Sequence, residues 1–329
     1  MREITFKEAI NEAIREEMRR DDSVIFLGED IGIYGGGFGV PLGLIEEFGP
    51  SRIIETPISE LTFTGAAVGS AMTGLRPIVE VMFSDFITLA MDPLVNQAAK
   101  NRYQFGGQTS VPMVFRGASG SGTGAAAQHS QSLEAWVAHV PGLKVVIPST
   151  PYDAKGLMKT AIRDNNPVIF YEQKLLYATK GEVPPLDEEY TIPFGQADIK
   201  KGGEDVTLIT YGRMVQRSLD VAYSLKQEKN IDVEVIDIRT LVPLDVTTIL
   251  QSATKTGRVI VVHEAVKTGG FGAEIVSTIV ESDAFFTLKG PILRVAGLDV
   301  PIPFNKTLES LVVPTPEKIR EAIIQVAAY

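Results

Sequence analysis

The sequence of 329 residues contains no cysteine and only three histidines. The lack of cysteine excludes a disulfide framework, a thiolate metal site and a cysteine nucleophile. Any redox chemistry on thiols must therefore use the sulfur of a partner. The histidines stand at positions 129, 139 and 263, and they do not form a metal-ligand spacing.

Positive charge is also scarce, because 31 Lys and Arg stand against 41 Asp and Glu, a net charge of −10. No dense Lys/Arg cluster is present, so nucleic-acid binding is not expected. No apolar run approaches the ~18–20 residues of a membrane span. The N-terminus is too charged for a signal peptide. We therefore expect a cytoplasmic protein without a nucleic-acid or membrane partner.

The common phosphate-binding and hydrolase motifs are missing as well. There is no G-x-x-x-x-G-K-[ST] loop and no G-x-S-x-G elbow. Residues 120–125 satisfy the loose form G-x-G-x-x-A after an expected strand, but no acidic residue lies about 20 positions further on. These absences argue against a P-loop, a hydrolase and a dinucleotide site.

Two blocks of alternating strands and helices are present, which predicts an α/β fold with parallel sheets covered on both faces. The first block has expected helices at 5–20, 86–102 and 152–163, and strands at 23–27, 78–83, 111–115, 143–147 and 168–171. The second has strands at 206–211, 233–238, 259–263 and 292–296, and helices near 214–227, 246–255, 272–282 and 316–327. We expect domains at 1–175 and 201–329, joined by a linker at 176–200.

One acidic residue, Glu60, stands in an apolar setting. It lies in the run Glu55-Thr-Pro-Ile-Ser-Glu-Leu-Thr-Phe63, directly before a helix of small residues. A carboxyl group placed there loses water, and desolvation disfavours its charged form. Such a group can share a proton with a neutral nitrogen base, which is a catalytic task. The residues alone leave open a buried, hydrogen-bonded structural carboxylate.

Several motifs in order resemble one family, the beta subunit of the thiamine-diphosphate-dependent component of 2-oxo acid dehydrogenase complexes. The resemblance runs from about residue 3 to about residue 325 and is nearest to the pyruvate and acetoin members. Its motifs are Gly28-Glu-Asp30, Ile58-Ser-Glu-Leu61, Ala127-Gln-His-Ser-Gln131, Pro141-Gly-Leu-Lys-Val145, Ala161-Ile-Arg-Asp-Asn-Asn-Pro167 and Gly269-Gly-Phe-Gly272.

The resemblance implies roles for four residues around the cofactor. Glu60 would bond to the far nitrogen of the aminopyrimidine, and Ile58, with other apolar neighbours, would keep this site dry. Phe86 would stack on the aminopyrimidine ring, where the residues alone also allow a core aromatic. His129 would lie at the active-site mouth and assist acyl transfer to a lipoyl group, although the residues alone favour a structural histidine.

The run from Ala161 to Asn166 reads locally as a helix end with asparagine near the C-cap. By resemblance it is a potassium site in some members of the family. The carbonyls of Ala161, Ile162 and Met113 and groups of Asp164 and Asn166 would bind the ion. Oxygen ligands suit such a hard cation.

The resemblance also implies partners. The chain contains no Gly-Asp-Gly, the motif with which the family's alpha subunit holds the diphosphate and its magnesium. We therefore expect activity only in an alpha2–beta2 heterotetramer, which would pass the acyl group to the lipoyl domain of a dihydrolipoyl acyltransferase. Open alternatives are a branched-chain 2-oxo acid enzyme and a non-catalytic assembly subunit of the same fold.

Overall fold

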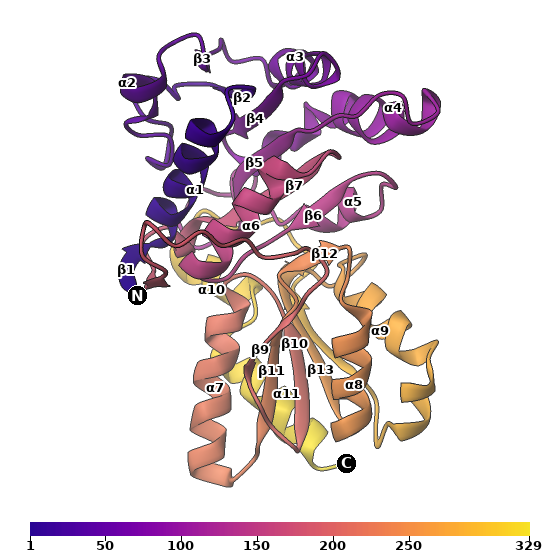
Figure 1. Ribbon diagram of the computed structural model, residues 1–329. Coiled ribbons are helices and arrows are strands. Elements are labelled where there is room, and N and C mark those ends of the chain that lie inside the picture. Colours follow the sequence, from indigo (N-terminus) through magenta and orange to yellow (C-terminus); the bar gives the residue numbers. More distant parts are fainter. The chain divides into compact units, whose positions relative to one another are not determined.

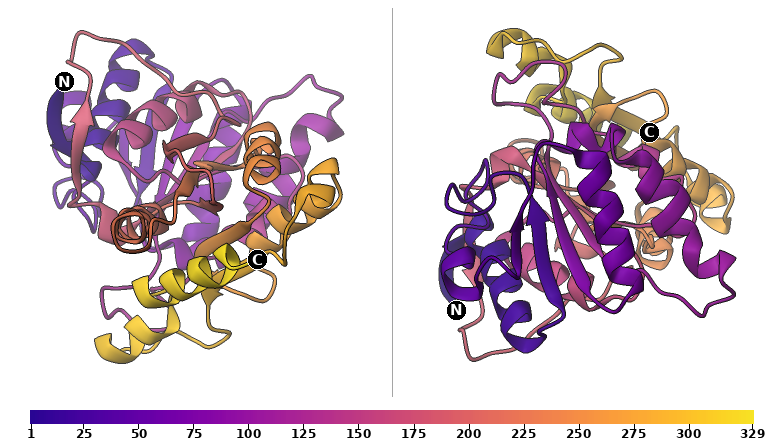
Figure 2. Two further views of the ribbon diagram at one scale, coloured as in Figure 1. Left: turned by 90° about the horizontal axis from the view of Figure 1, so that it is seen from below. Right: turned by 90° about the horizontal axis from the view of Figure 1, so that it is seen from above.

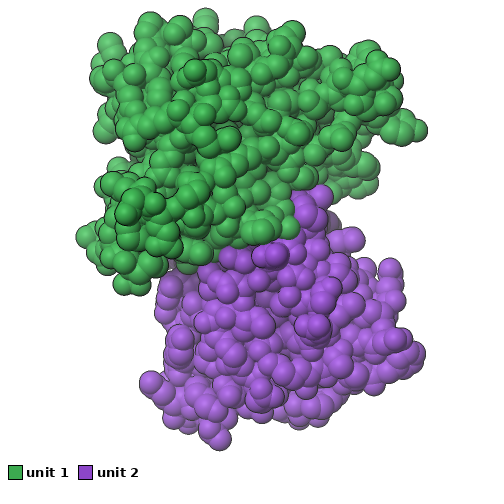
Figure 3. Space-filling model, viewed as in Figure 1, with its two compact units in different colours: residues 1–119, 136–194 green, residues 120–135, 195–329 purple.

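The computed structural model describes all residues 1–329, and the chain forms two compact units. Unit 1 comprises residues 1–119 and 136–194, and unit 2 comprises residues 120–135 and 195–329 (Figure 3). The assignment of residues 120–135 to unit 2 differs from the continuous domains expected from the sequence. The reason is long-range hydrogen bonding, which no local pattern reveals.

Unit 1 is built on a parallel sheet with the strand order β6-β7-β5-β4-β2-β3 (Figure 1). The strands are β2 (Val24–Gly28), β3 (Ile53–Glu55), β4 (Arg76–Val81), β5 (Val114–Ser119), β6 (Lys144–Val146) and β7 (Val168–Gln173). Every residue of β2, β5 and β7 is buried. Such continuous burial is typical of parallel strands covered on both faces.

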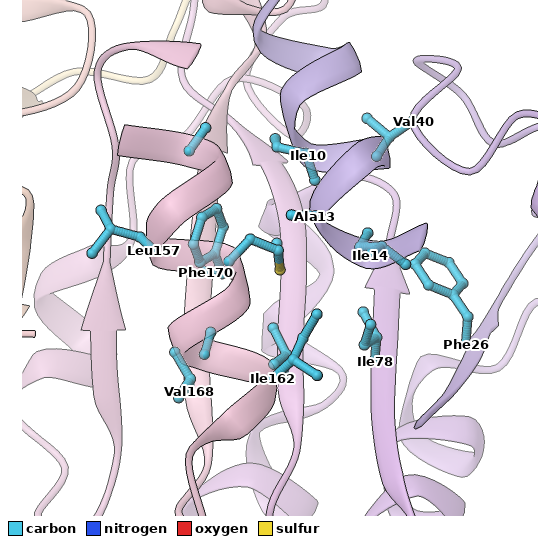
Figure 4. Close-up of a cluster of buried hydrophobic side chains, with 14 of the residues drawn as sticks. Ile10, Ala13, Ile14, Phe26, Val40, Ile78, Leu157, Ile162, Val168 and Phe170 are labelled. Atoms are coloured by element: carbon cyan, nitrogen blue, oxygen red, sulfur yellow. The ribbon is translucent and has the colours of Figure 1, made fainter. Parts of the chain in front are cut away.

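Helices α1 (Phe6–Arg20) and α6 (Pro151–Arg163) pack together on one face of this sheet. A capping box of Thr5 and Glu8 starts α1, as the sequence predicts. Thr150 caps α6 through the backbone N–H of Asp153, and Pro151 occupies the first turn. Apolar side chains of α1 point at those of β2, β4, α6 and β7 (Figure 4).

The opposite face carries α3 (Glu60–Met72) and α4 (Ala99–Gln104). The right panel of Figure 2 shows the strands of unit 1 standing between α1 and α3. The single regular helix expected over 86–102 is wrong in its first part. The chain instead forms a 3-10 turn, η1 (Ser84–Thr88), and then a π-helix (Pro93–Ala98) that leads into α4. Pro93 stands in the first turn of this second segment, where its missing N–H costs no helical hydrogen bond.

The remaining elements of unit 1 are short. They are β1 (Arg2–Thr5), α2 (Leu44–Phe48), α5 (Glu134–Ala138, whose first residues belong to unit 2), η3 (Lys174–Leu176) and β8 (Lys180–Val183). Strands β1 and β8 pair in antiparallel fashion. The stretch expected to be a linker, 176–200, thus contains β8 and the start of β9.

Unit 2 has a second sheet with the order β14-β13-β10-β11-β9, in which only the edge strand β9 is antiparallel. Its strands are β9 (Asp198–Lys201), β10 (Val206–Thr210), β11 (Val233–Asp237), β13 (Val259–Val266) and β14 (Leu293–Gly297). The short strand β12 (Thr240–Val242) is not part of this sheet. Its helices are α7 (Met214–Lys229), α8 (Val246–Thr256), α9 (Gly272–Val280), α10 (Lys306–Val312) and α11 (Pro316–Ala327). Helices α7 and α11 pack together over one apolar cluster, and α8 contacts α9. None of the chain's helices has the length and apolar character needed to cross a bilayer.

Candidate active site

The candidate site forms where three neighbouring strands of unit 1 end. Strand β2 lies between β3 and β4, so the chain leaves β2 for β3 on one side and returns to β4 on the other. The segments after these strands carry Glu29, Glu60 and Phe86. Ligands of open α/β sheets bind outside the carboxyl ends of the strands at such a switch point. Strand order therefore brings together residues that are far apart in the sequence.

Glu60 is the first residue of α3, and only 7% of it is exposed. The preceding residue, Ser59, makes no side-chain cap. Glu60 therefore lies in the first turn of the helix, where the unpaired backbone N–H groups favour negative charge. This position holds a desolvated carboxyl group on a rigid element, as a proton-sharing role requires.

A second acidic residue, Glu29, shares this region, and its carboxyl group is buried. Burial, then the nearby charges of Glu60 and Asp30, raise its pKa to about 7, while the backbone N–H of Ser59 opposes the shift. Its Oε1 atom has no hydrogen-bond partner. Glu29 and Glu60 are thus two repelling carboxyl groups, and Glu29 takes up a proton near neutral pH.

Glu29 was not predicted from the sequence as a site residue. The run Gly28-Glu-Asp30 stood out only as one motif of the family resemblance. The available signal was an acidic residue directly after a fully apolar strand, since such a residue lies at the carboxyl edge of a parallel sheet. Its neighbourhood to Glu60 depends on the pairing of β2 with β3, which the sequence does not display.

The aromatic and apolar residues of the site differ in exposure. Phe86 is half-buried in η1, and Phe63 is buried behind Glu60. Ile58 and Leu61, by contrast, are 81% and 54% exposed. In this chain by itself they therefore do not shield the site from water, and the expectation that they keep it dry stays a prediction.

His129 lies in unit 2, within residues 120–135, and is half-buried. Its backbone N–H donates to the carbonyl of Ala126, at 3.4 Å, and Ala126 adopts a positive φ of 65°. The structure thus places the two expected catalytic residues in different units: Glu60 with Phe86 and Ile58 in unit 1, and His129 in unit 2.

Four of the five expected potassium ligands, in residues 161–166, lie at the end of α6, and the fifth, Met113, directly precedes β5. Nη1 of Arg76 donates to the carbonyls of Ile162 and Asp164, both at 3.0 Å. The carbonyl of Met113 accepts from the backbone N–H of Val168, and that of Ala161 accepts from the N–H of Asp164. Each carbonyl oxygen has a second lone pair, so these bonds leave it able to bind an ion.

The side chains at this turn are engaged with cations and amides of the chain. Burial alone would raise the pKa of Asp164, but hydrogen bonds from Lys144 and Asn166 hold it below its ordinary value. The Asn166 side-chain oxygen accepts from Arg102 at 3.1 Å. Any ion here would therefore depend mainly on the backbone carbonyls.

His263 is a structural residue and has no exposed surface. Its Nδ1 lies 3.1 Å from the carbonyl of Ala265, to which it donates as a neutral ring. Its other ring edge faces Gly272, where an added Cβ would lie 2.6 Å from Nε2. Gly270 and Gly272 therefore have no room for a side chain at the start of α9. Burial is the main reason that the pKa of His263 falls to about 4.

This shift predicts an acid-sensitive contribution of His263 to stability. Below pH 6.5 the imidazole of His263 is protonated in the unfolded chain, whereas in the folded chain it stays neutral down to about pH 4. The contribution of neutral His263 to the free energy of unfolding should be complete above pH 6.5. It should decline on acidification by up to about 1.4 kcal/mol per pH unit. His263→Asn, which keeps a donor for Ala265, should lose less stability than wild type between pH 6.5 and 4.5, as measured by urea unfolding. The exposed His139, replaced by Asn, is the control; parallel curves for wild type and His263→Asn would contradict the assignment.

Comparison with known proteins agrees with this architecture. Residues 2–180 match the family described as the transketolase pyrimidine binding domain, and residues 195–319 match the transketolase C-terminal domain. A split-gene transketolase, described as an inactive beta4 tetramer, has the same fold, with a TM-score of 0.80 at 21% identity over 99% of this chain and 98% of that one.

Proteins of similar length are much closer in sequence. The pyruvate dehydrogenase E1 component subunit beta of Rickettsia felis is 50% identical, over 99% of both chains. The acetoin:2,6-dichlorophenolindophenol oxidoreductase subunit beta of Cupriavidus necator is 49% identical, over 98% of this chain and 96% of its own.

Proposed function

This chain belongs to the family of beta subunits that includes pyruvate dehydrogenase E1 subunit beta and acetoin oxidoreductase subunit beta, and on this premise we propose its reaction. It works with an alpha subunit and thiamine diphosphate to decarboxylate pyruvate or to cleave acetoin, and it passes the acyl group to a lipoyl domain. The observation that most supports this proposal is the buried pair of carboxyl groups, Glu29 and Glu60, near the ends of the strands.

The residues present fit the pyrimidine half of the cofactor. When bound, thiamine diphosphate supplies a carbon nucleophile and an aminopyrimidine that acts as its base. Glu60 would share a proton with the far ring nitrogen, and Phe86 would cover the ring face. Stacking of this kind is worth about 0.5–1.5 kcal/mol beyond area burial. The unpartnered Oε1 of Glu29 shows that this region has hydrogen-bonding capacity that the chain itself does not use.

The exposed apolar residues next to Glu60 suit a subunit interface. Ile58 and Leu61 flank the carboxyl group and are exposed in this chain. We propose that the alpha subunit covers them in an alpha2–beta2 heterotetramer and holds the diphosphate and its magnesium. Covering this surface would exclude water and strengthen the hydrogen bond of Glu60 to the ring.

His129 would act on the lipoyl group. One sulfur of the dithiolane accepts the acyl group, the S–S bond breaks, and the other sulfur leaves as a thiolate. The two electrons that reduce the disulfide come from the substrate carbon, which is oxidised to the acyl level. An imidazole can donate the proton that the departing thiolate needs near neutral pH. The lipoyl sulfur is the thiol partner that a cysteine-free chain requires.

The proposal is tested with the chain purified together with its alpha subunit. Dye reduction is measured with pyruvate, acetoin and a branched-chain 2-oxo acid, each with and without thiamine diphosphate. We expect cofactor-dependent turnover of pyruvate or acetoin by the pair and none by either subunit alone. Turnover by the lone chain, or cofactor-independent turnover by the pair, would contradict the proposal.

We also propose that potassium binds the carbonyl oxygens at the end of α6. The chain should then melt a few degrees higher in potassium chloride than in sodium chloride of equal ionic strength, since an ion that binds only the folded state stabilises it by mass action. Asn166→Ala should reduce the difference, whereas replacing the adjacent Asn165 should not. Identical melting curves in the two salts would exclude a potassium site.

A further inference from the structure

The segment that carries His129 is held by buried charged groups of unit 2. We define the His129 loop as residues 120–133, between β5 and α5. It contains three glycines with positive φ, at 120, 122 and 124. Glycine loses more conformational freedom on ordering than any other residue. A loop of this composition needs fixed partners if it is to hold a side chain in one place.

The first anchor is a buried ion pair. Glu264 on β13 pairs with Arg213, and both are buried. Oε1 of Glu264 accepts from the backbone N–H and the hydroxyl of Ser121, at 2.6 and 2.9 Å. Arg213 in turn donates to the carbonyl of Ser121 at 3.1 Å and to its hydroxyl at 2.9 Å. All the backbone and side-chain polar groups of one loop residue are thus bound by this pair.

The second anchor is Glu309 on α10, which is 2% exposed. Its two carboxylate oxygens accept the backbone N–H groups of Gly122 and Gly124, at 2.6 and 3.0 Å. Directly after the loop, the hydroxyl of Tyr211 donates to Glu134, the first residue of α5, at 2.9 Å. The loop also closes on itself, since the N–H of Gly120 donates to the carbonyl of Gln131 at 3.1 Å.

Buried charges are costly unless their partners are well placed, and replacing such a pair by apolar residues often leaves stability unchanged. Stability alone therefore does not explain why two buried carboxylates are directed at the backbone of one loop. We propose that Glu309 and the Arg213–Glu264 pair are positioning residues that hold His129 in place for acyl transfer. This inference rests on the function proposed above.

Loss of these positioning residues should affect only one step of the reaction. A displacement of about 1 Å can reduce a positioned reaction by about 100-fold. Loosening the loop should therefore slow the step that uses His129, and it should spare the earlier steps at Glu60, which lies in unit 1. A structural role would lower both steps together.

The test compares two rates of the enzyme reconstituted with its alpha subunit. Reduction of 2,6-dichlorophenolindophenol bypasses the lipoyl group, whereas acylation of an isolated lipoyl domain requires it. Glu309→Ala should slow acylation about tenfold or more, with dye reduction within about twofold of wild type. Ser121→Ala, which keeps the backbone bond to Glu264, is a milder second variant and should change the same ratio in the same direction.

The matched control is Glu234→Ala. Glu234 is also a buried carboxylate of unit 2, and it accepts from Ser252 and Lys255 without touching the loop. Its replacement should leave the ratio of the two rates at the wild-type value. Equal ratios in Glu309→Ala, Ser121→Ala and Glu234→Ala would overturn the positioning role.

Hydrogen exchange of a peptide covering 120–133 gives a readout that is independent of activity. Glu309→Ala should exchange faster in this peptide than wild type and Glu234→Ala do. Wild-type exchange in Glu309→Ala would overturn the inference whatever substrate the enzyme takes. Failure of the wild-type pair to reduce dye would instead overturn the proposed function, and the exchange data would still decide whether Glu309 orders the loop.

Discussion

Replacing Glu60 by glutamine should lower turnover of the reconstituted enzyme by about two to four orders of magnitude, the range typical of a lost acid–base group. Glutamine has nearly the same shape, but its amide cannot share a proton with the pyrimidine nitrogen. Glu60 is the first residue of α3 and not its N-cap, which is Ser59, so its side chain is not needed to start the helix. Its loss from a helix N-terminus should cost only about 0.3–1 kcal/mol of stability.

The measurement is steady-state dye reduction with saturating thiamine diphosphate, together with a melting curve. Glu46→Gln is the matched control, since Glu46 is an exposed acidic residue in the first turn of α2. Its replacement should leave turnover at the wild-type level. Near-normal turnover in Glu60→Gln would remove the proton-sharing role from this residue.

Replacing Arg116 by methionine should destabilise the chain by about 3–5 kcal/mol, because it leaves buried carboxylates without their cation. Arg116 on β5 is fully buried and pairs with Glu80 on β4 and Glu172 on β7. The hydroxyl of Tyr177 donates to the same Glu172 at 2.9 Å. Burial and the charge of Glu172 raise the pKa of Glu80, which the positive charge of Arg116 opposes.

A loss of this size is a large part of the 5–15 kcal/mol that stabilises an ordinary domain. Denaturant unfolding of the isolated chain measures it directly. Arg15→Met removes a cation that pairs with Glu47 at the surface, and it should cost about 1 kcal/mol or less. Adding Glu80→Gln to Arg116→Met should restore part of the stability, since it removes one of the two repelling carboxyl groups. Equal losses in the two arginine variants would contradict this account.

The helices that the sequence predicted well carry their signals locally. The capping box before α1 and the cap and proline before α6 lie within a few residues of the helices that they start. The expected helix over 86–102 was wrong in its first part, where the chain forms η1 before the helical segment that contains Pro93. Local patterns therefore locate most elements, and they mislead where one apolar stretch contains two separate helical segments.

Only part of the candidate site could be predicted from the sequence, for a related reason. Glu60 could be singled out because its apolar neighbours are adjacent in the sequence, whereas Glu29 acquires its raised pKa from burial and from the charge of Glu60, which begins α3. Ile58 was expected to line a dry site and is exposed, since apolar character does not state which way a side chain points.

By itself, the sequence determined the α/β class, most helices and strands, the family resemblance and the importance of Glu60, because these depend on periodicity, caps and motifs within short stretches. Only the tertiary structure decided that β2 lies between β3 and β4, that Glu29 joins Glu60, and that residues 120–135 belong to unit 2. The physical reason is that strand pairing and buried hydrogen bonds join residues more than a hundred positions apart, such as Ser121 and Glu264. No local sequence pattern identifies which distant residue will form such a contact.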